Sequence, residues 1–135
     1  MSTERTLNNA SGFSLVEALV ATSLLAMISL GFAIGADRAV RYNVYGRSLA
    51  AATTLAHDKL EDLQSKVSTD AHLTAGTHTD AANPLTTTGT TGGIFTRTWN
   101  VTNNTPATGL KTIAVTVTWT IYSQAHTVNL VMVHS

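Results

Sequence analysis

The sequence predicts an α+β protein in which one long N-terminal helix packs on a small three-stranded antiparallel sheet. Three observations predict this fold. An uninterrupted apolar segment lies near the N-terminus, a segment with apolar residues at helical spacing follows it directly, and the C-terminal part alternates between apolar and polar residues. With 135 residues, of which 12% are charged, the chain has room for one modest domain.

The apolar segment covers residues 13–36, FSLVEALVATSLLAMISLGFAIGA, and Glu17 is its only charged residue. A helix of this length rises roughly 36 Å at about 1.5 Å per residue, which is enough to cross a bilayer. It contains no proline, and lipid requires backbone hydrogen bonds to be satisfied within the segment. We therefore expect a transmembrane helix. The alternative, a buried core helix, would need more surrounding protein than this chain supplies.

The helical pattern continues without proline over residues 37–68. Apolar residues recur there every three or four positions, and most charged residues fall on other faces. We expect one continuous helix that becomes amphipathic in its second part, with Gly46 as its weak point. The predicted apolar stripe consists of Leu49, Ala52, Ala56, Leu60, Leu63 and Val67.

The strands are expected at the C-terminal end. Residues 69–93 are rich in Thr, Ala, Gly and Asp and predict an irregular, variable loop. Residues 94–135 predict an antiparallel meander, with Trp99 and Trp119 in its core and a tight turn at Ser123-Gln124. The apolar face of such a meander needs a cover, which the amphipathic helix supplies. The expected strands are residues 94–102, 110–122 and 125–134.

The twelve residues before the apolar segment, MSTERTLNNASG, are too polar for the apolar part of an ordinary signal peptide, which is cleaved after its apolar stretch. Residues 12–17, GFSLVE, resemble the class III signal of type IV prepilins and type II secretion pseudopilins. The resemblance implies a pilin-like fold, cleavage between Gly12 and Phe13 by a prepilin peptidase, and N-methylation of Phe13. Residues 1–12 are then a cleaved leader.

Glu17 stands at the fifth position of the expected mature chain, where the resemblance requires Glu. A carboxylate inside hydrocarbon costs several kcal/mol unless it is neutralised or paired. The resemblance assigns Glu17 to subunit assembly, as the partner of a neighbouring subunit's new amino terminus. The simpler alternative is a carboxylate that stays protonated or reaches the membrane interface.

Gly31 and Gly35 form a GxxxG pattern inside the apolar segment, which permits close approach of a second helix. The pattern has three interpretations: helix packing, local unwinding, or a chance occurrence of small residues. Packing against other pilins through the N-terminal helix is the first of these.

Two further segments refine the resemblance. Residues 55–63, LAHDKLEDL, and residues 110–120, LKTIAVTVTWT, resemble stretches of PilV-type minor pilins and of the I-type minor pseudopilin. The resemblance implies a minor type IV pilin that takes part in priming pilus assembly; the alternatives are a minor pseudopilin of a type II secretion system and a pilus-tip adhesion or DNA-uptake subunit. It also implies a single-pass protein of the bacterial inner membrane, with the leader cytoplasmic and the C-terminal domain periplasmic, that later joins a pilus or pseudopilus.

The composition argues against other classes of function. Eight Lys and Arg balance eight Asp and Glu, which leaves few cations for phosphates and argues against direct nucleic-acid binding. The chain has no cysteine, its five histidines show no zinc-site spacing, and no nucleophile elbow is present. We expect no catalytic residues, no metal and no cofactor.

Overall fold

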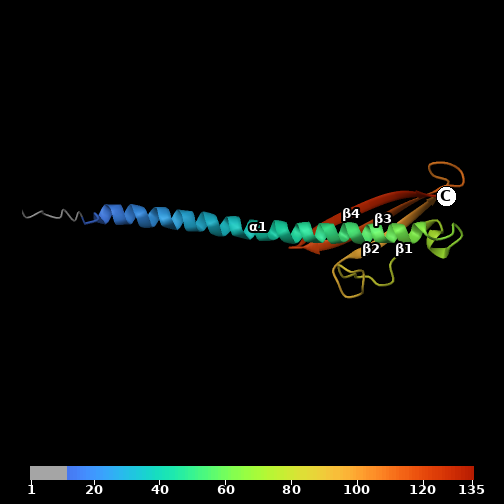
Figure 1. Ribbon diagram of the computed structural model, residues 1–135, viewed down its shortest axis with the longest axis horizontal. Helices are drawn as coiled ribbons and strands as arrows, with labels where there is room; N and C mark the ends of the chain where they lie inside the picture. Colours follow the sequence, from blue (N-terminus) through green and yellow to red (C-terminus); the bar gives the residue numbers. More distant parts are fainter. Residues whose placement is uncertain (1–11) are drawn as a thin grey trace, which may run out of the picture. The chain divides into compact units, whose positions relative to one another are not determined.

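The computed structural model describes residues 12–135, so nearly all of the expected leader lies outside the described residues. The chain divides into two compact units, one ending at Arg41 and one beginning at Tyr42, and each is described by itself. Figure 1 shows the elements in order. They are helix α1 (Leu15–Gln64), the short 3-10 helix η1 (Ala71–Leu73), and strands β1 (Gly76–Thr79), β2 (Thr96–Asn103), β3 (Lys111–Ile121) and β4 (Gln124–His134).

The first unit contains the apolar part of α1. An 18-residue window of this helix has a mean hydropathy of 2.1 and none of it is buried, so by length and composition the helix is able to cross a membrane. Its hydroxyl groups bond to the helix's own backbone: Thr22 Oγ1 donates to Ala18 O, and Ser23 Oγ donates to Leu19 O. These polar groups are therefore satisfied without water.

The second unit contains the amphipathic part of α1 and the sheet. This part of the helix buries Ala52, Leu55, Ala56, Leu60 and Leu63 against the sheet, which includes four residues of the predicted stripe, whereas Leu49, its first residue, is 36% exposed. Each fully buried leucine contributes roughly 1.5–3 kcal/mol relative to an exposed one.

The predicted stripe is wrong at its C-terminal end. The helix ends at Gln64 rather than at residue 68, and Val67 is 72% exposed. The chain leaves the helix through a tightened turn in which Lys66 N donates to Leu63 O. The Lys66 carbonyl then accepts a hydrogen bond from His134 Nε2 at 3.0 Å, which holds the residues just after the helix against the end of β4.

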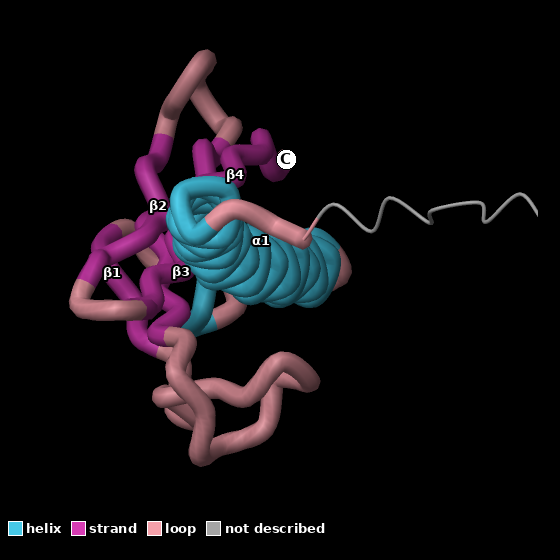
Figure 2. Tube along the Cα trace, turned by 90° about the vertical axis from the view of Figure 1, so that its left-hand side faces the viewer, coloured by secondary structure: helices cyan, strands magenta, loops and turns pink. Residues whose placement is uncertain are grey.

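The sheet is antiparallel throughout, with the order β1-β2-β3-β4. The expected α+β class is correct, but the sheet has four strands and not three. The additional strand, β1, lies inside the expected loop 69–93 and has no apolar alternation that would reveal it. It pairs with β2 through the backbone, and His78 stacks on Trp99 with ring centroids 5.3 Å apart. Figure 2 shows the strands on one side of α1, with two loops extending beyond the sheet.

The segment expected to be an irregular loop also supplies part of the core. Leu73 and Leu85 are fully buried, and Leu85 forms a backbone bridge with Phe95. A Cβ added at Gly93 would lie 1.9 Å from Leu85 O, so the close backbone approach at this bridge requires glycine. The segment is therefore held against the sheet.

At the C-terminal end, the expected core tryptophans are confirmed, but the expected tight turn is misplaced. Trp99 and Trp119 are both buried, as expected. The tight turn lies at Tyr122-Ser123, one residue earlier than predicted, and both residues have positive φ. Neither is the Asn or Gly that usually marks such a turn, so the sequence did not locate it.

Candidate functional site

The expected cleavage site lies immediately before α1. Gly12 and Phe13 precede the first helical residue, Leu15, so the peptide bond between them lies outside the helical hydrogen-bond ladder. Phe13 is 83% exposed, and within the described part of the chain no atom other than those of its chain neighbours lies within 4 Å of a Cβ placed on Gly12. The backbone at this point is therefore open to an enzyme.

Glu17 lies in the first turn of α1 and its side chain is exposed. An acidic residue at this position interacts favourably with the positive end of the helix dipole, by roughly 0.3–1 kcal/mol. Within residues 12–135 no cationic side chain forms an ion pair with it.

Gly31 and Gly35 lie one helical turn apart on the same side of α1. Apart from its chain neighbours and the backbone of its own helix, no atom of the described residues lies within 4 Å of a Cβ added at either position. The structure therefore leaves this small-residue surface open and brings no other part of the described chain against it.

Residues 7–33 match the protein family described as the prokaryotic N-terminal methylation motif. This chain carries the class III signal of type IV prepilins and pseudopilins. The matched range includes Gly12, Phe13 and Glu17, and it ends two residues before Gly35. No curated protein and no solved structure matches the chain. The class III signal thus defines the N-terminal segment, while the second unit has to be interpreted from its own structure.

The second unit contains a nearly buried ion pair between Arg97 and Asp80. Arg97 donates to Asp80 Oδ2 through Nε at 2.9 Å and Nη2 at 2.6 Å, and to Leu55 O through Nη1 at 2.8 Å. Burial alone would raise the pKa of the Asp80 carboxyl, but hydrogen bonds from the Ala82 N–H and from Arg97 hold that pKa below its ordinary value. The pair ties the segment after β1 to both β2 and α1.

The histidines take part in structural contacts, two of them at the Trp99 ring. His72 O accepts from Trp99 Nε1 at 2.9 Å, His78 stacks on the same indole ring, and Lys59 Nζ lies 4.3 Å from its centroid. His126 stacks on Trp119 with centroids 5.4 Å apart. Among the described residues, no group of three His, Asp or Glu is placed to hold a metal ion.

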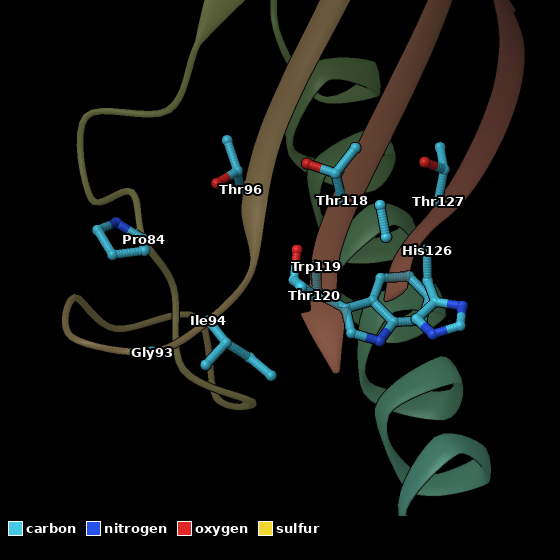
Figure 3. A pocket seen from close by; sticks show the side chains of 10 residues that line it. Pro84, Gly93, Ile94, Thr96, Thr118, Trp119, Thr120, His126 and Thr127 are labelled. Atoms are coloured by element: carbon cyan, nitrogen blue, oxygen red, sulfur yellow. The ribbon is translucent and has the colours of Figure 1, made fainter. Parts of the chain in front are cut away.

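A shallow cavity of about 500 Å³ lies where the loop after β1 meets the turn between β3 and β4. Figure 3 shows the stacked Trp119 and His126 rings on one side of it and the threonines of neighbouring strands on another. No carboxylate, lysine or arginine lines it, so it offers no acid-base pair beside a nucleophile. Its lining includes Pro84, Ile94, Thr96, Thr118, Trp119 and His126.

Proposed function

We propose that this chain is a minor type IV pilin of the PilV type, which is processed by a prepilin peptidase and takes part in priming pilus assembly with other pilins. The observation that carries the proposal is the methylation motif of residues 7–33, which leads directly into an apolar helix able to cross a membrane. The subunit first sits in the bacterial inner membrane and later joins the pilus.

Processing acts on the junction between Gly12 and Phe13. Cleavage removes the polar leader, and the exposed, non-helical backbone at this junction gives the peptidase access to the bond. The cut also creates a new amine at Phe13, and the peptidase then methylates this amine. It lies four residues before Glu17. Processing thereby supplies a positive charge in a segment that otherwise contains a single carboxylate.

Assembly uses that charge. When apolar helices pack together, the Glu17 carboxylate leaves the lipid interface and enters a low-dielectric environment, where an unpaired charge is costly. The Phe13 amine of a neighbouring subunit offsets this cost when the two helices are displaced along their axes. Gly31 and Gly35 favour close approach of the same helices.

The second unit has a structural role in this proposal. Its ionisable groups form local contacts, such as the Asp80–Arg97 pair, and neither the cavity beside Trp119 nor the one beside His134 contains a catalytic constellation. The proteins that carry this signal are generally structural subunits and not enzymes. The unit stays outside the membrane, where it contacts other subunits.

A minor pseudopilin of a type II secretion system is the second candidate, because the LAHDKLEDL stretch of α1 resembles both subfamilies. Both candidates share the same processing and the same use of Glu17. Deleting the gene separates them: loss of surface pili with normal protein secretion supports the pilin, and the reverse supports the pseudopilin.

The decisive experiment is the intact mass of the protein from membranes of cells with and without the prepilin peptidase. We expect a peptidase-dependent chain that begins at methylated Phe13. An uncut chain beginning at Met1 in both strains would refute the proposal.

A further inference from the structure

The sheet ends in two unequal edges. The edge strand β1 has four residues, whereas β4 at the opposite edge has eleven. An edge strand presents unpaired backbone N–H and C=O groups, and proteins protect such edges with short strands, charged side chains or proline. β1 is protected because it is short. β4 contains neither proline nor an Asp, Glu, Lys or Arg residue.

The turn between β3 and β4 identifies the free backbone groups of β4. Tyr122 and Ser123 form a two-residue turn with positive φ at both positions, so Ile121 and Gln124 are a hydrogen-bonded pair. Hydrogen-bonded and non-hydrogen-bonded pairs alternate along an antiparallel ladder. The odd-numbered residues of β4 therefore direct their backbone groups away from β3. They are Ala125, Thr127, Asn129, Val131 and Val133.

The same alternation identifies the free groups of β1. When the alternation of hydrogen-bonded and non-hydrogen-bonded pairs is followed across β3 and β2, the even-numbered residues of β1 are the ones that bond to β2. The hydrogen bond from Asp80 N to Arg97 O, directly after β1, also involves an even-numbered residue and agrees with this assignment. Thr77 and Thr79 therefore direct their backbone groups to the outside of the sheet.

The outer edges of β1 and β4 are complementary in register. The strand pairings align Thr77, Asn100, Ala114 and Val131 in one row across the sheet, and Thr79, Thr98, Thr116 and Asn129 in another. A second copy displaced sideways along these rows brings its Thr77 opposite Val131 of the first copy. Its Thr79 then lies opposite Asn129, and all four residues direct their backbone groups into the new junction.

We propose that β4 of one copy of this protein pairs with β1 of a second copy, which extends the sheet from subunit to subunit. Because the sheet has an even number of alternating strands, the new pair is antiparallel when both copies point in the same direction. The hydrogen-bonded pairs are Val131 with Thr77 of the second copy and Asn129 with Thr79 of the second copy.

The direction of the copies selects this partner over β4 of another copy. Two β4 strands would pair antiparallel around a two-fold axis perpendicular to them, which reverses residues 42–64 of α1 in one copy. Subunits anchored in one membrane share one direction, and this step rests on the proposed function. Four strands at about 4.8 Å spacing make each copy roughly 19 Å wide, which leaves room for its α1 of about 10 Å diameter.

The junction also fits in charge. β1 and β4 are both free of Asp, Glu, Lys and Arg, so no like charges meet across it. The charged side chains in the other two strands, Arg97 and Lys111, face the helix side and bond to Leu55 O and to Leu73 O, respectively. Val131, at the junction, is 59% exposed in the single chain.

Cysteine crosslinking tests the pairing, because the natural chain contains no cysteine. The full chain with Thr77→Cys and Val131→Cys together is expressed in membranes and treated with a short thiol-specific crosslinker. Within one chain the two positions are three strand spacings apart, about 14 Å, so a short reagent joins them only between copies. We expect a ladder of crosslinked dimers and higher multimers.

Three controls define the expected result. Each single cysteine variant should give no dimer, because the pairing joins unlike positions. The double variant with Thr77→Cys and Thr118→Cys should also give none, because Thr118 is exposed on β3 inside the sheet and not at its edge.

The other outcomes overturn the pairing. Dimers of the Val131→Cys single variant would show two β4 strands together, adducts with a different protein would show another occupant, and equal crosslinking of the Thr118 control would show random collision. Absence of crosslinks in all variants would refute the pairing as well. The N-terminal mass of the same samples separates this failure from failure of the proposed function, since a chain that begins at methylated Phe13 but gives no ladder overturns the sheet pairing alone.

Discussion

Replacing Arg97 with alanine should destabilise the second unit strongly. The change removes the hydrogen bonds at 2.6 and 2.9 Å to Asp80 and the one at 2.8 Å to Leu55 O. The Arg97 and Asp80 side chains are only 12% and 13% exposed, so Asp80 would remain as a nearly buried carboxylate without its cation. Breaking a buried pair from one side typically costs about 3–5 kcal/mol, which is a large part of the roughly 5–15 kcal/mol that stabilises a domain.

Tryptophan fluorescence measures this loss in the full chain in detergent, since both tryptophans, Trp99 and Trp119, are buried in the second unit. At about 4–8 °C per kcal/mol for a domain of this size, the melting temperature should fall by at least ~12 °C. The matched control is Glu61→Ala, which breaks the exposed His57–Glu61 contact and should cost less than ~1 kcal/mol.

A double variant completes the test. Asp80→Ala combined with Arg97→Ala removes the buried charge together with its partner and should recover part of the stability lost in Arg97→Ala. If Arg97→Ala melts within a few degrees of Glu61→Ala, the ion pair does not hold the segment after β1, and the reasoning is wrong.

The remaining predictions concern processing, backbone packing and pH. Gly12→Val should block maturation, so mature-sized protein on a gel would contradict the cleavage site. Glu17→Ala should be cut normally yet fail to restore assembly in a deletion strain, and full restoration would exclude the pairing role. Gly93→Ala should lower stability by more than ~1 kcal/mol in urea unfolding, because its Cβ would meet Leu85 O, whereas Gly46→Ala on the open side of α1 should raise stability by up to ~1 kcal/mol. The folded-state pKa of the Asp80 carboxyl is below its ordinary value, so its contribution to stability is present above that ordinary value and is lost as the pH falls through the folded-state pKa; Asp80→Asn should flatten this acid limb in melting scans.

The sequence predicted well where the signal is local. The class III signal, the apolar helix and the alternating face of β3 each depend on spacing within one stretch of chain, so residue types alone indicate them. The α+β class followed, because an amphipathic helix and a one-sided sheet bury their apolar faces together.

The sequence failed where distant segments meet. β1 has no apolar pattern, and it is a strand because its backbone hydrogen-bonds to β2. Leu85 lies in the core because its backbone bridges to Phe95 and because Gly93 has no side chain to block that approach. The segment that follows α1 is likewise held by a distant residue, since His134 Nε2 bonds to the carbonyl of Lys66, which lies 68 residues away along the sequence.

The sequence by itself therefore determined the N-terminal features: the methylation motif with its expected cleavage site, and an apolar segment long enough to cross a membrane. Only the tertiary structure decided the surface of the second unit: which strands lie at the edges, which backbone groups they leave free, and that Asp80 and Arg97 meet. The physical reason is that cleavage signals and helix periodicity are properties of neighbouring residues. Edges and ion pairs are properties of contacts between residues far apart in the chain, which only folding brings together.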